Sequence, residues 1–156
     1  ILLCGPTGVG KSHLANALAI EALKRGLRVI SGSIHHILND IHSARANSPH
    51  PFLLSRLYTC DLLVLDDFGL QPLPPSAIQD LYEIIAERYE RGSIIVTSNR
   101  AFEEWHEVFG NQLLASAALD RLTHHAHLLV ITGDSYRQRS HRKEVLSKAL
   151  SSNQTN

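Results

Sequence analysis

The sequence contains no methionine, a single tryptophan and only two cysteines among its 156 residues. It also lacks an excess of charge, because fifteen basic residues balance fifteen acidic ones when histidine is neutral. Nothing in the overall charge points to a polyanionic partner, so any surface for nucleic acid has to be local. No apolar stretch approaches the roughly 20 residues that a membrane span requires. We therefore expect a cytoplasmic protein with no membrane partner.

The rare cysteines and the missing methionine each lead to an expectation. Cys4 and Cys60 lie in or beside apolar runs, and a cytosolic chain usually keeps such residues reduced and buried, so we expect no disulfide. Methionine is absent even at position 1, and the first motif begins at Gly5. We expect a fragment that lacks an N-terminal segment, with one domain at 1–150 and a disordered polar tail at 151–156.

Short apolar runs alternate with longer helical patterns along the chain. Five runs rich in valine, isoleucine or leucine predict strands at Ile1–Cys4, Arg28–Ser31, Leu62–Asp66, Ser93–Ser98 and Leu128–Thr132. Lys11–Arg25 is predicted to be a helix that Gly26 closes, and a second helix is predicted to begin after Pro74–Pro75. To a solvated face of this second helix we assign Glu83, Glu87, Arg88, Glu90 and Arg91. The alternation predicts an α/β fold with a five-stranded, mostly parallel sheet flanked by helices.

The segment GPTGVGKS at residues 5–12 fits the phosphate-binding P-loop pattern G-x-x-x-x-G-K-[ST], placed between an apolar strand and a helix. Its glycines allow backbone N–H groups to surround phosphates, and the helix N-terminus adds partial positive charge. Lys11 is expected to reach the β and γ oxygens, and the Ser12 hydroxyl to help hold Mg²⁺. The alternative, a glycine-rich turn that binds nothing, does not explain the whole motif. The expected nucleotide-binding residues here are Gly5, Pro6, Thr7, Gly8, Val9, Gly10, Lys11, Ser12 and His13.

A second motif, LLVLDD at residues 62–67, is an apolar strand that ends in two carboxylates. Asp66 is expected to complete the Mg²⁺ shell, largely through water, because Mg²⁺ dehydrates reluctantly. Asp67 is expected to orient or deprotonate the attacking water. Positioning and charge stabilisation supply most of the rate of phosphoryl transfer, so the second carboxylate favours hydrolysis over passive binding. Without the P-loop upstream, an Asp-Asp turn that caps a strand would be the better explanation of the motif.

A third strand pattern, IIVTSN at residues 94–99, ends in polar residues after an apolar run. The order of P-loop, DD motif and this strand resembles AAA+ ATPases. In that family the strand lies between the other two, and its terminal polar residue, called sensor 1, faces the γ-phosphate and the water. The resemblance gives this role to Asn99, whose amide can both donate and accept hydrogen bonds. A Ser-Asn turn in a loop is the alternative.

Four segments point to one group within the AAA+ ATPases. They are LLVLDDFGLQPL at 62–73, ERYERGSIIVTSNRAFEEW at 87–105, LDRLTHHAH at 119–127 and GDSYR at 133–137. Together they resemble IstB-like proteins, the ATPase partners of certain bacterial transposases. The resemblance implies an ATPase that assembles as a homo-oligomer on double-stranded DNA, with ATP at subunit interfaces, and helps a transposase to select or engage its target. DnaC-type helicase loaders share much of the pattern, and a nucleotide-dependent switch without useful turnover is a further alternative.

Two arginines take roles from the same resemblance. AAA+ proteins usually hydrolyse ATP between subunits, where an arginine of the neighbour stabilises charge on the transferred phosphate. Arg121 matches the position of this arginine finger, and Arg137 could act as a nucleotide sensor within its own subunit. For both, a surface ion pair is the alternative. The AAA+ pattern normally continues into a helical lid, which we expect to be absent or vestigial after Arg137.

Histidines and a late basic run are the remaining candidates for binding. The histidines form two groups, His35 with His36 and His42, and His124 with His125 and His127. Neither group has the helical i, i+4 pairs or cysteine partners that zinc sites commonly use, so the spacing does not predict zinc. The basic cluster is Arg137, Arg139, Arg142 and Lys143. It suits contact with DNA phosphates, although a charged helix face has the same pattern.

Overall fold

The structure, a computed structural model, describes residues 1–46 and 50–139. Within these ranges five parallel strands form one sheet in the order β2-β3-β4-β1-β5. The strands are β1 (Leu2–Cys4), β2 (Val29–Ser33), β3 (Leu62–Phe68), β4 (Ser93–Ser98) and β5 (Leu128–Val130). All five lie where the sequence predicts strands. β4 lies between β1 and β3, as the resemblance to AAA+ proteins implies.

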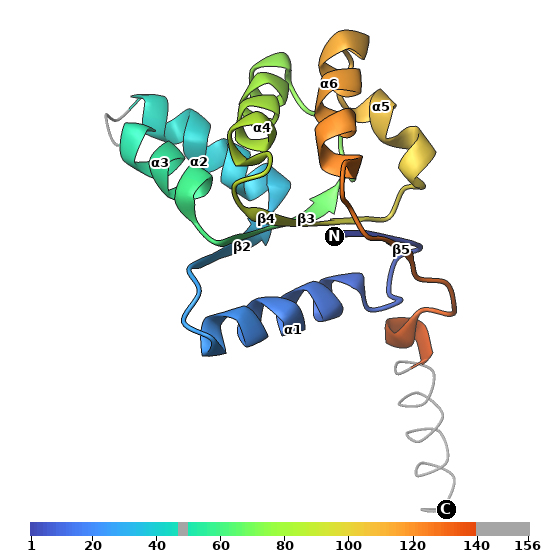
Figure 1. The fold of residues 1–156 in the computed structure, drawn as a ribbon. Coiled ribbons are helices and arrows are strands. Elements are labelled where there is room, and N and C mark those ends of the chain that lie inside the picture. Colours follow the sequence, from blue (N-terminus) through green and yellow to red (C-terminus); the bar gives the residue numbers. More distant parts are fainter. Residues whose placement is uncertain (47–49, 140–156) are drawn as a thin grey trace, which may run out of the picture.

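Helices cover the two faces of the sheet unequally (Figure 1). One face carries α1 (Lys11–Lys24), which follows the P-loop as predicted. The other face carries α2 (Ile34–Ala46), α3 (His50–Thr59), α4 (Pro75–Arg88), α5 (Trp105–Val108) and α6 (Gln112–Thr123), with the short 3-10 helix η1 (Phe102–Glu104) before α5. The sheet is therefore the middle of three layers, and its central strands β1, β3 and β4 are apolar because helices pack on both sides.

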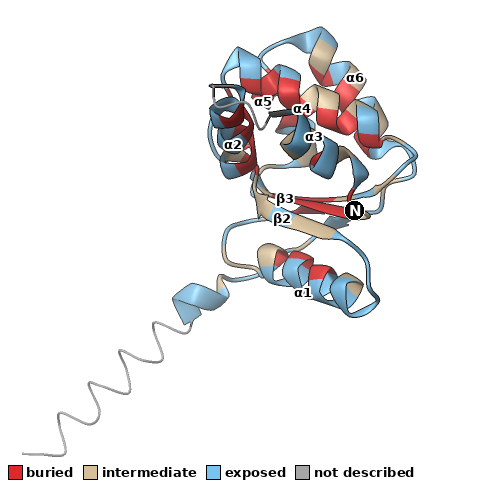
Figure 2. Cartoon of the chain, turned by 90° about the vertical axis from the view of Figure 1, so that its left-hand side faces the viewer, coloured by how far each residue is buried: buried red, intermediate tan, exposed pale blue. Residues whose placement is uncertain are grey.

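Successive side chains of a strand point to opposite faces, so each central strand contributes to both layers. On β3, Leu63 and Leu65 join the larger core beneath α2 to α6, while Leu62 and Val64 pack with α1 on the opposite face. Figure 2 shows β3 as a buried strand between these layers. The two carboxylates of the DD motif follow this buried run, so the core fixes the strand that positions them.

One residue of α4 differs from its predicted environment. Arg88, which we assigned to a solvated face, is fully buried. Its guanidinium donates to the carbonyl oxygens of Leu57, Cys60 and Ser93, each at 2.8 Å. A buried charge is tolerated where hydrogen bonds replace its hydration, and a guanidinium carries five N–H donors for that purpose. Arg88 therefore joins the end of α3 to the start of β4.

Several further expectations can be compared with the described residues. Cys4 and Cys60 are buried and unpaired by disulfide, as predicted, and burial raises the pKa of each thiol. No helix among the described residues is long and apolar enough to cross a membrane. Arg142, Lys143, the domain boundary at 150 and the tail at 151–156 lie outside the described residues.

Candidate functional site

The carboxyl ends of β1, β3 and β4 open toward one cavity of about 770 Å³. Its walls are P-loop residues 7–13, both carboxylates of the DD motif, Leu70, Asn99, and the adjacent pair Tyr136 and Arg137. Open α/β sheets bind ligands at this edge, beyond the carboxyl ends of their strands. The fold thus brings together most of the predicted site residues from four separate segments of the chain.

Glycine is required at two points of the P-loop. Gly5 has a φ of 145°, and a Cβ there would lie 2.0 Å from the carbonyl oxygen of Ile131. Gly8 has a φ of 86°, and a Cβ there would lie 2.1 Å from Oγ of Ser135. A side chain at either position would push the loop away from the segment after β5 that supports it. The loop conformation therefore depends on the close approach of residues 131–135.

Lys11 is buried at the start of α1, with 8% of its surface exposed. Its ammonium donates to the carbonyl oxygen of Gly5 at 2.7 Å and of Pro6 at 2.8 Å. Burial lowers the pKa of Lys11, while the nearby carboxylates of Asp67 and Asp66 act in the opposite direction. Charged acceptors form stronger hydrogen bonds than neutral carbonyls, so phosphate oxygens would compete well for this ammonium.

The two residues predicted to hold Mg²⁺ are in contact. Ser12 Oγ donates to Oδ1 of Asp66 at 2.9 Å, although 54 residues separate them. A hydroxyl and a carboxylate are the hard oxygen ligands that Mg²⁺ prefers, and the cavity beside them leaves room for the waters that this ion retains. The residues present therefore fit a Mg²⁺ ion bound together with a nucleotide.

Thr97 supports the DD motif, a role that the sequence did not reveal. Its side chain is buried, and its hydroxyl donates to the carboxylate of Asp66. Oγ1 of Thr97 also accepts a hydrogen bond from the backbone N–H of Asp67, at 3.1 Å. Asp67 has a φ of 61°, in the left-handed region that non-glycine residues seldom adopt, so this hydrogen bond helps to hold an unfavourable conformation. The one sequence feature that could have indicated this role is that Thr97 is a polar residue directly after the apolar run of strand β4, which pairs with β3.

The end of β4 is fixed by its own hydrogen bonds. Ser98 is buried, donates through Oγ to the carbonyl oxygen of Phe68 at 2.7 Å, and accepts the N–H of Arg100 at 3.1 Å. Asn99, between these two anchored residues, is exposed and lines the cavity. Asn99 therefore shares this cavity with the P-loop and the DD motif, and its sensor 1 role stays a prediction.

The segment after β5 closes one side of the cavity. The backbone N–H of Tyr136 donates to the carbonyl oxygen of Gly8 at 2.9 Å, which ties the SYR motif to the P-loop. Tyr136 and Arg137 are both exposed and both line the cavity. The resemblance assigns a sensor role to Arg137 and no role to Tyr136, because the contribution of Tyr136 is a backbone contact that no side-chain pattern indicates.

Arg121 lies outside this cavity. It is half-buried in the last turn of α6, where its guanidinium donates to the carbonyl oxygen of Ala117 at 2.7 Å and lies 5.6 Å from the ring centroid of Tyr82. It lines a different cavity, of about 530 Å³, that includes no P-loop residue. Arg121 thus does not serve the chain's own nucleotide cavity, and its role toward a neighbouring subunit stays a prediction.

Comparison with known proteins decides the family. A sequence model described as IstB-like ATP binding protein matches residues 1–144. The chain belongs to this family. A protein named as an ATP-binding protein of insertion sequence IS5376, from Geobacillus stearothermophilus, is 38% identical over 91% of this chain and 57% of its own length. Its IS21 counterpart from Pseudomonas aeruginosa is 39% identical over 95% of this chain and 56% of its own length. The IstB-like chain therefore spans little more than half the length of these curated relatives.

Solved structures show the same fold. AMPPCP-bound DnaA from Aquifex aeolicus matches with a TM-score of 0.73 and 25% identity, over 95% of this chain and 45% of that chain. The DnaC helicase loader matches with a TM-score of 0.72 and 24% identity, over 85% of this chain and 77% of that chain. The IstB-like chain thus has the AAA+ type of P-loop NTPase fold, and both the predicted fold and the family resemblance are confirmed.

Proposed function

We propose that this chain is the core of an AAA+ ATPase that binds ATP with Mg²⁺ and hydrolyses it to ADP and phosphate. The observation that carries the proposal is the convergence of the P-loop, the DD motif and Asn99 on one cavity. The contact between Ser12 and Asp66 supports Mg²⁺ binding, because it places the two expected ligands side by side. A second carboxylate at Asp67 supports hydrolysis, because simple binding does not require it.

Each residue of the site has its own role in the proposed reaction. Lys11 exchanges its two carbonyl partners for β and γ oxygens of ATP, and Ser12 and Asp66 hold the Mg²⁺, which supplies positive charge to the phosphates when bound. Asp67 orients the attacking water and accepts its proton. Asn99 donates to a γ-phosphate oxygen and accepts from the water. Pre-positioned groups of this kind lower the barrier without reorganising during the reaction.

For the biological role we propose a transposition helper that assembles on double-stranded DNA as a homo-oligomer and assists a transposase in choosing or engaging its target. Support comes from the sequence relatives, since the proteins named for insertion sequences are 30% to 41% identical to this chain. Similarity to the DnaC helicase loader is lower, at 24%, and reflects the fold. A helicase loader remains the alternative, because both kinds of protein share this fold.

Steady-state phosphate release by the purified full-length protein tests the proposed activity. We expect Mg²⁺-dependent ATP turnover that duplex DNA increases, and only background turnover from Lys11→Ala. Tight ATP binding without turnover, with or without DNA, would instead identify a nucleotide-dependent switch. Co-sedimentation on DNA with either the transposase of the same element or the replicative helicase separates the two biological roles.

Replacing Thr97 with valine should lower ATP turnover about tenfold, the smaller end of the range for losing an orienting partner of a metal site. Valine keeps the branched shape of threonine but loses both hydrogen bonds to the DD motif. ATP affinity should change much less, because the P-loop is untouched. The measurements are phosphate release and ATP titration. As a control, Thr59→Val removes an exposed hydroxyl that donates to the carbonyl oxygen of Ser55, and this variant should behave like the parent protein. An equal loss of ATP binding and of turnover in Thr97→Val would contradict the orienting role of Thr97.

A further inference from the structure

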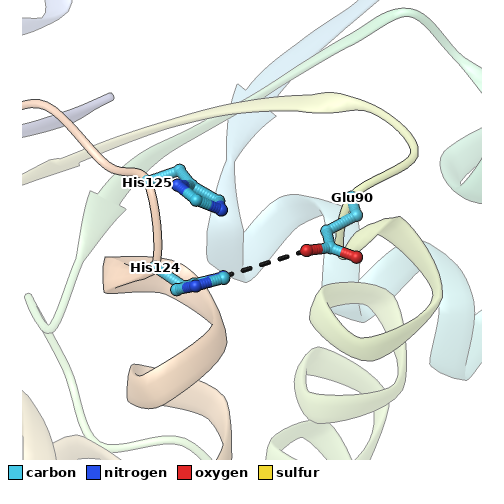
Figure 3. Close-up of side chains that lie close together, drawn as sticks. All are labelled: Glu90, His124 and His125. Atoms are coloured by element: carbon cyan, nitrogen blue, oxygen red, sulfur yellow. Dashed lines mark ion pairs between the residues drawn. The ribbon is translucent and has the colours of Figure 1, made fainter.

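We propose that Glu90, His124 and His125 form a binding site for a divalent transition-metal ion such as Zn²⁺, separate from the ATP cavity (Figure 3). One carboxylate oxygen and two imidazole nitrogens of these residues lie within 4.8 Å of one another. This combination of ligands suits zinc and related ions, and it differs from the oxygen ligands that Mg²⁺ prefers. Histidine spacing alone did not predict zinc, because the carboxylate comes from a distant part of the sequence.

The fold assembles the three residues at the ends of two neighbouring helices. Glu90 follows the end of α4 at Arg88, and His124 directly follows the end of α6 at Thr123. The last carbonyl groups of a helix give its C-terminus partial negative charge. A cation held between the two helix ends is therefore favoured by both helix dipoles as well as by the Glu90 carboxylate.

The distances allow coordination after small side-chain movements. Glu90 Oε1 lies 4.0 Å from Nδ1 of His124, and the rings of His124 and His125 have centroids 3.8 Å apart. Tetrahedral zinc, at about 2.1 Å from each ligand atom, would hold these atoms about 3.4 Å apart. The Glu90 and His124 side chains are 61% and 48% exposed, so the packing around them leaves room for inward rotation. Their exposure also lets water complete the coordination shell.

The backbone at two of the three residues is unusual. Glu90 has a φ of 58° and His125 a φ of 60°. Among the described non-glycine residues, Asp67 of the DD motif is the one other with a positive φ. Backbone conformations of this kind are unfavourable and tend to occur at functional sites. Here they turn the chain after each helix so that the side chains of both turns face one another (Figure 3).

Tyr89 is the group that an ion would have to displace. Its hydroxyl lies 2.6 Å from Nδ1 of His124, the same nitrogen that faces Glu90. Metal binding at this nitrogen requires the hydrogen bond to break, so the tyrosine competes with the ion. A bound ion would also hold the end of α6 against α4, one helical turn after Arg121.

Calorimetric titration of the full-length protein with Zn²⁺, without nucleotide and with excess Mg²⁺, tests this site. Mg²⁺ occupies oxygen sites such as Asp66 without competing for imidazole. We expect one Zn²⁺ per chain, and at least about tenfold weaker binding in Glu90→Gln and in His125→Asn, since even indirect partners of a metal contribute that much. Asparagine tolerates the left-handed backbone at position 125, so this variant removes the ligand without adding strain.

Two further variants make the test specific. His36→Ala removes an exposed histidine that has a carboxylate partner, Asp40 at 3.7 Å, but is not part of the three-residue cluster, and it should bind Zn²⁺ like the parent. Tyr89→Phe removes the competing hydroxyl and should bind at least as tightly. Parent-like binding by both Glu90→Gln and His125→Asn overturns the proposal, as does absence of Zn²⁺ binding by the parent. Circular dichroism of each variant confirms that it is folded.

Discussion

Replacing Arg121 with alanine should leave ATP binding nearly unchanged and reduce ATP turnover by roughly 10³-fold or more, the contribution expected of an arginine finger. The structure supplies the physical reason, because Arg121 lies on α6 outside the nucleotide cavity of its own chain. Binding should therefore survive its removal. Turnover should fall because the neighbouring subunit loses the positive charge that stabilises its transition state. ATP titration and phosphate release, under conditions where the full-length protein assembles on DNA, measure the two effects.

Mixing two inactive variants separates a role between subunits from one within a subunit. Arg121→Ala keeps its own Lys11, Asp66 and Asp67, whereas Lys11→Ala cannot bind ATP normally but keeps Arg121. In a mixed oligomer, the Lys11→Ala subunit can supply Arg121 to a neighbour whose nucleotide site is intact. We expect activity above the sum of the separate variants. If light scattering shows mixed oligomers and no activity returns, Arg121 does not act across the interface.

Replacing Asp67 with asparagine should preserve binding of Mg²⁺ and ATP but slow hydrolysis by roughly 10²-fold or more, the usual contribution of a general base. Asparagine has nearly the same shape and tolerates the left-handed backbone, so the φ of 61° remains accessible. Asp66 keeps its hydrogen bond from Ser12, which leaves the predicted metal ligands in place. The substitution should therefore lower the rate constant of the hydrolysis step itself, which single-turnover kinetics measures.

A matched substitution controls for the loss of charge. Asp40→Asn removes an exposed carboxylate on α2, away from the nucleotide cavity, and should turn over ATP at the parent rate. Asp67 would be wrongly assigned if its asparagine variant hydrolysed ATP as fast as the parent. A combined loss of ATP affinity and turnover would instead indicate that the substitution disturbs the phosphate-binding loop.

Features set by local sequence were predictable. The strands are short apolar runs, and helices bury the central strands β1, β3 and β4. Gly5 and Gly8 of the P-loop occupy positions where a side chain would collide with the backbone of Ile131 or with Ser135. The resemblance to AAA+ proteins also implied that β4 lies between β1 and β3, as observed. The carboxyl ends of parallel strands meet at one edge, so the convergence of the DD motif and Asn99 followed from the strand assignments.

Features that depend on contacts between distant segments were not predictable. Arg88 has the charge of a surface residue, yet the carbonyl groups of Leu57, Cys60 and Ser93 make its burial favourable. Thr97 looks like an ordinary strand residue until β3 and β4 pair and bring its hydroxyl to Asp66. Glu90 joins two histidines only because α4 and α6 end side by side. In each case the partner lies too far along the chain for a local pattern to identify it.

The hydrogen bond between the N–H of Tyr136 and the carbonyl oxygen of Gly8 has a mechanical consequence. Gly8 belongs to the loop proposed to bind the phosphates, and Tyr136 belongs to the segment that follows β5. With Ser135 packed where a Gly8 side chain would be, the two segments have little room to move independently. A displacement of the P-loop must therefore move the segment after β5 with it, or the hydrogen bond between Tyr136 and Gly8 must break. The position of residues 135–136 is in this way coupled to the conformation of the P-loop.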